Sequence, residues 1–362
     1  MRIGILNSGG DCPGLNAVIH GAVGAASELG WEVIGFRDGF EGLLPNGPGH
    51  VKLDPERTIG ILKLGGTILG TTNKGNFAAK VGVDNVALVP AEIMDQARAT
   101  IKYLGIDALI VVGGDGTLTT GLQLCNEGVP VVGVPKTIDN DLQATSMTFG
   151  FDSAVAAVVD ALDRLHTTAD SHQRVMVVEV MGRHAGWIAL YGGIGGGADI
   201  VLLPEIKFTM DNVAQRVNHL YASGHRSVLI VVAEGAQLED GQLMTREQMD
   251  AEKRQVKLGG IGEFVAKQVE KMTGHETRDV RLGHLQRGGS PTALDRILGT
   301  RFGVKAVHLI KEKKFGRMVS YQSYHVGDVA IEEAVNQLRL VKPDGEVVQA
   351  ARAVGISFGD SK

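Results

Sequence analysis

Short runs of apolar, largely β-branched residues recur along this chain of 362 residues, and segments of helical pattern separate most of them. Runs of this kind, apolar on both faces, are typical of parallel strands that helices cover on both sides. They lie at residues 3–6, 33–36, 108–112, 129–134, 175–180 and 228–232. Candidate helices lie at residues 15–29, 91–104, 153–165, 211–223 and 262–272. This alternation predicts a doubly wound α/β fold with one or two such sheets, and Asp152 or Ser153 is a candidate cap of the third helix.

Length, charge and composition limit the domain number and the partners of the chain. At ~150 residues per domain the length allows two or three domains. A net charge of −5 and the lack of a long Lys/Arg block argue against nucleic acid as a partner. Because no run of 18 or more apolar residues occurs, we expect no membrane partner and a cytoplasmic location. The two cysteines, Cys12 and Cys125, lie in separate contexts, which argues against a structural disulfide or metal cluster.

Glycine makes up 50 of the 362 residues, and many of these glycines fall in loops between the predicted elements. Three such loops are SGGDCPG at 8–14, GGT at 65–67 near GTTNKGN at 70–76, and GGDGT at 113–117. Backbone N–H groups at a helix N-terminus can bind phosphate oxygens, and glycine lets the backbone approach closely. One glycine loop can equally be an ordinary turn, but three in one half of the chain indicate phosphate binding. Since none reads GxxxxGK[ST], the chain is not a P-loop NTPase.

Carboxylates follow two of the predicted strands. Asp115 comes directly after the strand at 108–112, at the carboxyl edge where α/β sheets bind ligands. We expect it to hold Mg²⁺ between phosphate oxygens, with a turn or helix-cap role as the alternative. Asp139 and Asp141, in PKTIDND, reach the same edge after the next strand. One of them can accept the proton of an attacking hydroxyl while the other holds metal, and an Asx-rich turn is the alternative.

Arginines in the second half supply positive charge. Arg183 in MGRHAG and Arg287 in HLQRGGS adjoin glycines and strand ends, a setting suited to binding a phosphate group bidentately. Arg174 and Arg278 are further candidates. Hydrogen bonds to sugar hydroxyls could come from Glu234 and His284, although for His284 a structural role fits as well.

These motifs together resemble those of the phosphofructokinase family. The matching segments occur in the family's order and cover roughly residues 1–335: SGGDCPGLNA, GGT with GTTNKGN, GGDGT, PKTIDND, SHQR, VMGRHAGW and ETRDVRLGHLQRGGSP. The resemblance implies two doubly wound three-layer α/β/α lobes with the active site in the cleft between them. Residues 1–150 with about 286–336 would form a lobe that binds nucleotide and Mg²⁺. Residues 151–285 with about 337–362 would form a lobe that binds fructose 6-phosphate, with a polar insertion at about 235–260.

The resemblance also implies an activity, the transfer of the γ-phosphoryl group of ATP to the 1-hydroxyl of fructose 6-phosphate, with Mg²⁺. The product would be fructose 1,6-bisphosphate. Asp139 would accept the proton beside Thr137, Arg183 would stabilise the transferring group, and Asp115 would hold the metal, helped by Asp141. The residues expected to bind ATP are Gly10, Asn73, Lys74, Gly114, Asp115, Gly116 and Thr117. The residues expected to bind fructose 6-phosphate are Thr137, Asp139, Arg174, Met181, Gly182, Arg183, Glu234, Arg278, His284, Leu285, Gln286 and Arg287.

Two features of the family bear on assembly and regulation. Two of its sugar-phosphate arginines come from a neighbouring subunit, and Arg174 and Arg278 match them, so a homo-oligomer is implied, a tetramer or else a dimer. The bacterial effector site for ADP and phosphoenolpyruvate is a cluster of basic side chains. The matching residues here carry little fixed positive charge, so we expect a weak response to both effectors: His20, Gly24, Pro55, His166, Ser223 and His225.

Two positions bear on the phosphoryl donor. Bacterial ATP-using members usually have glycine where this chain has Lys136, and pyrophosphate-using members have lysine there and aspartate at position 116. This chain combines Gly116 with Lys136, a pair that also occurs in an ATP-using branch. A side chain at position 116 would fill the space of the α-phosphate, so Gly116 favours ATP. We expect Lys136, as a flexible cation that can turn into solvent, to suit either donor, which leaves pyrophosphate as the alternative.

Two further functions compete with this one. GGDGT also occurs in NAD and diacylglycerol kinases, but these lack PKTIDND and HLQRGG. A non-catalytic sugar-phosphate sensor is the alternative of a different class. The presence of Asp139 and Arg183 argues against a sensor, because binding alone needs no base.

Overall fold

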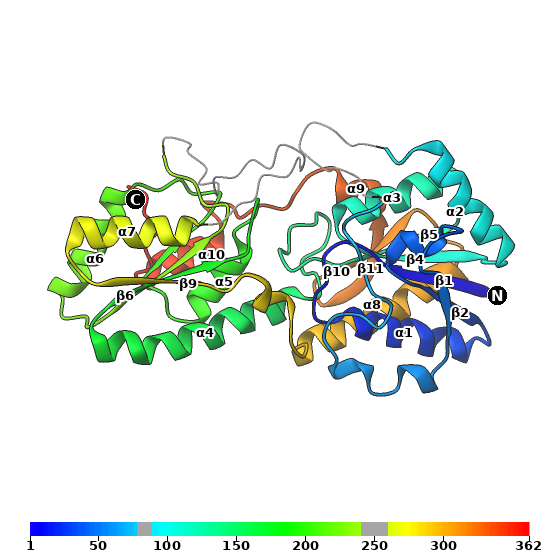
Figure 1. Ribbon diagram of the computed structural model, residues 1–362, viewed down its shortest axis with the longest axis horizontal. Helices are drawn as coiled ribbons and strands as arrows, with labels where there is room; N and C mark the ends of the chain where they lie inside the picture. The colour runs from blue at the N-terminus through cyan, green and yellow to red at the C-terminus, as the bar shows by residue number, and fades with distance from the viewer. Residues whose placement is uncertain (78–87, 240–259, 362) are drawn as a thin grey trace. The chain divides into compact units, whose positions relative to one another are not determined.

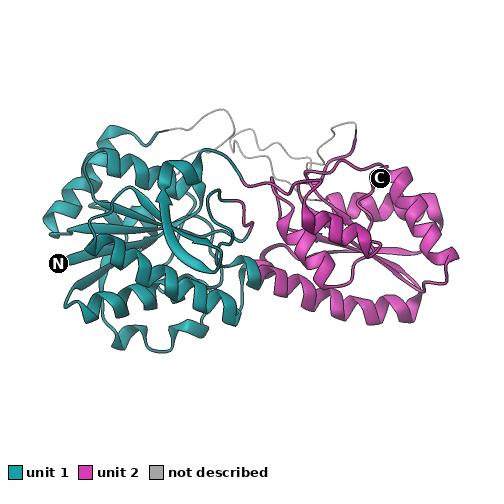
Figure 2. Ribbon diagram, turned by 180° about the vertical axis from the view of Figure 1, so that it is seen from behind, with its two compact units in different colours: residues 1–138, 142–153, 287–338 teal, residues 139–141, 154–286, 339–362 magenta. Residues whose placement is uncertain are grey.

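The computed structural model describes residues 1–77, 88–239 and 260–361 (Figure 1). The chain divides into two compact units, which Figure 2 colours teal and magenta. Unit 1 consists of Met1–Ile138, Leu142–Ser153 and Arg287–Leu338, and unit 2 of Asp139–Asp141, Ala154–Gln286 and Arg339–Lys362. The tripeptide Asp139–Asp141 therefore packs with unit 2, although the residues on both sides of it belong to unit 1.

Unit 1 is built on a sheet whose described strands run in the order β11-β10-β5-β4-β1-β2-β3. The strands β10, β5, β4, β1 and β2 are parallel, whereas β3 and β11 are antiparallel edge strands. Their bounds are β1 (Arg2–Asn7), β2 (Glu32–Phe36), β3 (His50–Leu53), β4 (Ala108–Gly113), β5 (Val131–Pro135), β10 (Arg317–Gln322) and β11 (His325–Ala330).

Helices cover both faces of the unit 1 sheet (Figure 1). On one face lie α1 (Leu15–Glu28) and α8 (Ala293–Lys311). The other face carries α2 (Ala91–Tyr103), α3 (Asp115–Asn126) and α9 (Ile331–Val335), whose apolar residues share a core with alternate residues of the strands. In this hydrophobic core, Leu109, Val111 and Val131 of the sheet pack with Met94 and Leu118 of the helices. The alternation follows from the two-residue period of a strand.

Unit 2 has a wholly parallel sheet in its described part, in the order β7-β8-β6-β9. The strands are β6 (Val175–Val180), β7 (Ile200–Leu202), β8 (Val228–Ala233) and β9 (Thr277–Arg281). The helices α6 (Met210–Ala222) and α7 (Ile261–Thr273) pack on one face. The long helix α4 (Phe151–His172) lies on the opposite face with α5 (Trp187–Gly195) (Figure 1). After α10 (Glu346–Ala353) the chain runs beside β7, where Val201 N donates to Ser357 O at 2.9 Å.

The predicted fold class, an α/β fold with parallel strands covered by helices, is confirmed, with corrections at the edges and helix ends. The sheet of unit 1 is mixed, because short antiparallel strands close both of its edges. The third predicted helix, at 153–165, corresponds to α4. It begins at Phe151, so neither Asp152 nor Ser153 is its N-cap. Both side chains instead contact the start of α8: Thr292 Oγ1 donates to Asp152, and Ser153 N and Oγ donate to Asp295 Oδ2 at 2.8 and 2.6 Å.

Two further sequence predictions concern a polar insertion and the lack of a membrane-spanning segment. The polar insertion expected at about 235–260 falls mostly on residues 240–259, which lie outside the described part of the chain. Among the helices of the described part, none is both long and apolar enough to span a membrane.

Candidate functional site

The glycine loops of unit 1 meet where its strand order reverses. Since β1 is flanked by β2 on one side and by β4 on the other, the loops after β1 and β4 lead to helices on opposite faces. Open α/β sheets bind ligands at such a point, beyond the carboxyl ends of the strands. The loop after β1 is fixed by Ser8 N donating to Val112 O and by Gly9 N donating to Thr72 O, both at 3.0 Å. This second bond brings the exposed residues Asn73 and Lys74 beside the loop.

Lys136 lies at the centre of this arrangement. Its Nζ donates to Gly10 O at 2.5 Å, and the side chain is buried, so the expected flexible, solvent-seeking lysine is wrong. Burial lowers the pKa of the Lys136 ammonium, while the nearby charges of Asp115 and Asp11 act in the opposite direction. In the same loop, burial raises the pKa of the Cys12 thiol to about 12, so this cysteine is a neutral packing residue.

The N-terminus of α3 carries the candidate metal ligand. Asp115 is the first residue of this helix, Gly114 is its N-cap, and Gly116 and Thr117 complete the first turn. Thr120 Oγ1 donates to Gly116 O at 3.1 Å, so the carbonyl of Gly116 is bonded within α3. A carboxylate together with the free N–H groups of a helix start suits the phosphates of a metal-bound nucleotide.

Asp115 suits a Mg²⁺ ion that takes its other ligands from substrate phosphates and water. Among the described residues, no group of three or more His, Cys, Asp or Glu side chains could hold a metal ion. Mg²⁺ is commonly bound by one or two carboxylates plus substrate phosphates and water, so Asp115 can serve without such a group. Asp115 belongs to unit 1 and Asp141 to unit 2, so the predicted help from Asp141 stays a prediction.

Arg287 also lies beside the loop after β1. Its Nη1 donates to Asp11 O at 3.0 Å, and it belongs to unit 1, whereas its neighbours His284, Leu285 and Gln286 belong to unit 2. Its predicted contact with the sugar phosphate therefore stays a prediction. Thr137 lies two residues after the end of β5, and its carbonyl accepts a hydrogen bond from the buried Thr148 Oγ1 at 2.7 Å.

In unit 2 the predicted residues follow the carboxyl ends of three adjacent strands. Arg183 follows β6 after Met181 and Gly182, and Glu234 directly follows β8. The two loops are bonded together, since Gly235 N donates to Gly182 O at 3.1 Å. The approach is so close that a Cβ at Gly235 would lie 2.0 Å from Arg183 O, which explains the glycine after Glu234.

The turn after β9 contributes the third group. Gln286 is buried, accepts from Met181 N at 3.3 Å and donates to Gly283 O at 3.1 Å, so its side chain joins the loops after β6 and β9. His284 and Leu285 are exposed on the same turn. The sequence predicted Gln286 as a ligand residue, and the structure shows a side chain occupied with holding the loop that leads to Arg183.

Asp139, Arg183 and Glu234 form one electrostatic group. Burial raises the pKa of the Glu234 carboxyl, and the negative charge of Asp139 raises it further, while Arg183 and Arg281 lower it. Arg281, the last residue of β9, is itself paired with the buried Glu179 at 3.1 Å. The charges of Asp139 and Arg183 thus act on Glu234 in opposite directions, within the same unit of the chain.

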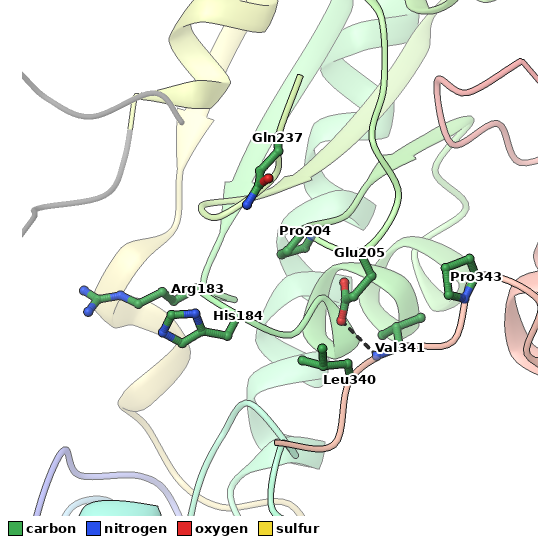
Figure 3. Close-up of a pocket in the computed structure, with 8 residues that line it drawn as sticks. All are labelled: Arg183, His184, Pro204, Glu205, Gln237, Leu340, Val341 and Pro343. Atoms are coloured by element: carbon green, nitrogen blue, oxygen red, sulfur yellow. Dashed lines mark hydrogen bonds between the residues drawn. The ribbon is translucent and has the colours of Figure 1, made fainter. Parts of the chain in front are cut away.

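A cavity of about 440 Å³ adjoins Arg183 in unit 2 (Figure 3). Its lining includes Arg183, His184, Glu205, Gln237 and the segment from Leu340 to Pro343. The Arg183 guanidinium points away from the Glu205 carboxylate, which accepts from Val341 N at 2.8 Å and from Gly186 N at 3.0 Å. Sequence reasoning missed Glu205 and the segment after Leu338, because nothing in their local pattern indicates a contact across 136 residues.

Arg174 and Arg278 lie near the amino ends of β6 and β9, at the opposite end of these strands from Arg183. Arg174 precedes β6 and its Nε is 2.8 Å from Glu276 Oε2, while Arg278 is paired in register with Met176 near the start of β6. At about 3.3 Å per residue, the strand separates them from Arg183 by roughly 20 Å. Within one chain, therefore, these two arginines do not join Arg183 and Glu234.

Comparisons with known proteins agree with these motifs. Residues 2–310 match the family model described as phosphofructokinase, so the chain belongs to the phosphofructokinase family. It is 50% identical over 359 residues to the ATP-dependent 6-phosphofructokinase of Chloroflexus aggregans, which covers 99% of this chain and 98% of the relative. It is also 45% identical over 361 residues to a pyrophosphate-fructose 6-phosphate 1-phosphotransferase of Streptomyces coelicolor, covering 99% of this chain and all of that one.

A solved structure supports the fold. The phosphofructokinase of Saccharomyces cerevisiae superposes with a TM-score of 0.80 at 31% identity, over 92% of this chain and 45% of the yeast chain. The family is therefore established by sequence and by structure. Relatives named for ATP and for pyrophosphate have similar identities, so overall similarity does not choose the donor.

Proposed function

We propose that this chain transfers the γ-phosphoryl group of ATP to the 1-hydroxyl of fructose 6-phosphate, the reaction of a 6-phosphofructokinase. The observation that carries the proposal is that Asp139 packs with unit 2, where the loops of Arg183 and Glu234 are bonded to each other through Gly235 N and Gly182 O. A sugar-phosphate sensor needs no proton acceptor beside an arginine, whereas phosphoryl transfer to a hydroxyl needs both. The relatives named ATP-dependent 6-phosphofructokinase support the same reaction.

In this proposal each residue has a distinct task. Asp139 accepts the proton of the 1-hydroxyl, Arg183 stabilises the charge on the transferring group, and Glu234 accepts hydrogen bonds from sugar hydroxyls. The start of α3 and the loop after β1 bind the nucleotide phosphates through backbone N–H groups. Asp115, helped by Asp141, would hold Mg²⁺. When bound, this ion would supply positive charge that neutralises the phosphate oxygens.

Gly116 supports ATP as the donor. An aspartate there would place a second carboxylate beside Asp115 at the start of α3, against the α-phosphate of a nucleotide. Lys136 Nζ donates to Gly10 O, so its amino group is held at the loop after β1 whichever donor binds. Pyrophosphate is the second candidate donor, favoured by Lys136 and by the Streptomyces relative.

The product identifies the reaction. After incubation with ATP, Mg²⁺ and fructose 6-phosphate, phosphorus NMR is expected to detect a second phosphomonoester on the sugar, at carbon 1. Binding of the sugar phosphate without any such product would favour the sensor.

We expect a pH dependence of substrate binding that Glu234 controls. Because its pKa is raised, this carboxyl takes up a proton at a higher pH than an ordinary glutamate when the solution is acidified. A protonated Glu234 loses its charge-assisted hydrogen bonds, so the KM for fructose 6-phosphate should rise as the pH falls through that pKa. Glu234→Gln should show a high KM without this acid limb, and the KM for ATP serves as the control. An unchanged acid limb in Glu234→Gln would assign it to another group.

The site is proposed to be shared between subunits of a homo-oligomer, with Arg174 and Arg278 reaching a neighbour's sugar phosphate. Hybrids of Arg174→Ala and Asp139→Asn chains should then regain activity. In such a hybrid, one site receives an intact Asp139 from one chain and an intact Arg174 from the other. Hybrids of Arg174→Ala and Arg278→Ala chains are the matched control, since every site there lacks one arginine. If subunit exchange is verified by mass spectrometry and the first mixture stays inactive, each site is built within one chain.

A further inference from the structure

The tripeptide that carries the proposed proton acceptor is fixed by one distant residue. Arg339 N donates to Asp141 O at 2.7 Å, and Arg339 Nη1 donates to Asn140 O at 3.2 Å. Two successive carbonyls directly after Asp139 are therefore bound by the same arginine. Asn140 has a φ of 52°, a left-handed conformation that a non-glycine residue keeps only when its surroundings hold it.

Arg339 is itself held on both its side chain and its backbone. Its guanidinium carbon lies 4.5 Å from the centroid of the Trp187 ring, and Trp187 Nε1 donates to Arg339 O at 2.8 Å. Two residues later, Val341 N donates to Glu205, which also accepts from Gly186 N, the residue before Trp187 (Figure 3). The start of α5 and Glu205 thus fix the segment at 339–341.

These contacts form a continuous path from the start of α5 to the loop of Asp139. A guanidinium is planar, so it can stack on an indole ring and donate in its own plane at the same time. A proton acceptor must lie within hydrogen-bond reach of the hydroxyl, and a displacement of about 1 Å can cost about 10²-fold in rate.

We propose that Arg339, stacked on Trp187, is a positioning residue that holds Asp139 in place for proton abstraction through the carbonyls of Asn140 and Asp141. This inference rests on the proposed function. Because Arg339 acts on Asp139 through the backbone carbonyls of Asn140 and Asp141, its loss should lower kcat while the KM of both substrates changes little.

Arg339→Gln is the test, and Arg352→Gln is the matched control. Arg352 also belongs to the C-terminal part of unit 2, stacks on an aromatic ring, Phe358, at 4.7 Å, and pairs with Asp360 at 2.6 Å. The contact path described above for residues 139–141 includes neither Phe358 nor Asp360. We expect kcat to fall about 10- to 100-fold in Arg339→Gln with KM values within about threefold, and to stay within about twofold in Arg352→Gln. Equal kcat values in the two variants would overturn the proposal.

Two further variants keep the test decisive if Arg339→Gln does not fold. Arg339→Lys keeps a donor without the planar stacking, so it should recover part of kcat, and Trp187→Phe keeps a ring without the N–H group. The chain has two tryptophans, so in a Trp31→Phe background Trp187 emission reports the stacking directly. A folded Arg339→Lys with full kcat and altered emission would contradict the proposal. An inactive unmodified chain would instead reject the proposed function, and this inference with it.

Discussion

Replacing Asp139 by asparagine is expected to lower kcat by about 10²- to 10⁴-fold while fructose 6-phosphate still binds. Asparagine has nearly the same shape but cannot accept the proton of the 1-hydroxyl. Because the charge of Asp139 raises the pKa of Glu234, the substitution should also shift the acid limb of sugar binding to lower pH. Steady-state kinetics gives the first effect, and calorimetric titration of fructose 6-phosphate against pH gives the second.

Asp163→Asn is the control for this substitution. Asp163 is an exposed aspartate on α4, so its replacement removes the same charge from unit 2 away from the site. Both variants should unfold at similar temperatures. Activity of Asp139→Asn within a few-fold of the unmodified chain would remove Asp139 from the role of base.

Replacing Gly116 by aspartate is expected to abolish turnover with ATP. The new carboxylate would stand beside Asp115 in the first turn of α3, against a nucleotide phosphate. Juxtaposed like charges cost several kcal/mol, and about 4 kcal/mol corresponds to ~10³-fold in affinity. The fold should survive, because an acidic residue in the first turn of a helix is favourable.

Gly116→Ala separates charge from size in this experiment, since it adds a methyl group alone. Initial rates with ATP should fall moderately in the alanine variant and below detection in the aspartate variant, at unchanged thermal stability. ATP turnover that persists in Gly116→Asp would show that position 116 does not select the donor.

Sequence reasoning found buried strands of five or six residues and missed the three-residue β7, although β7 is buried throughout. Runs such as VMVVEV in β6 are apolar on both faces and signal a central parallel strand. The edge strand β9, TRDVR, is mostly exposed and charged, so it has no apolar pattern to detect. α8 was missed because its glycines resemble helix breaks. In the structure, a Cβ at Gly303 would lie 2.2 Å from Val18 O, so this glycine lets α8 approach α1.

The residues of the candidate site also fall into two groups, those that sequence reasoning could place and those that it could not. Residues that follow a strand end within a motif, such as Asp115, Arg183 and Glu234, could be placed at a sheet edge from sequence, because strand order fixes where they lie. Lys136 could not be recognised as buried, since its partner, a backbone carbonyl, leaves no trace in the sequence. Arg339 was missed for the same reason: its hydrogen bonds go to backbone carbonyls 198 and 199 residues away.

The most direct measurement is the rate of fructose 1,6-bisphosphate formation by the unmodified chain, with fructose 6-phosphate, excess Mg²⁺ and either ATP or pyrophosphate at millimolar concentration. ATP is expected to support turnover and pyrophosphate to support none, because Gly116 leaves space for the α-phosphate while Asp139 and Arg183 serve the transfer. A rate with pyrophosphate equal to or above the rate with ATP would contradict ATP as the donor. No product with either donor would contradict the proposed reaction itself.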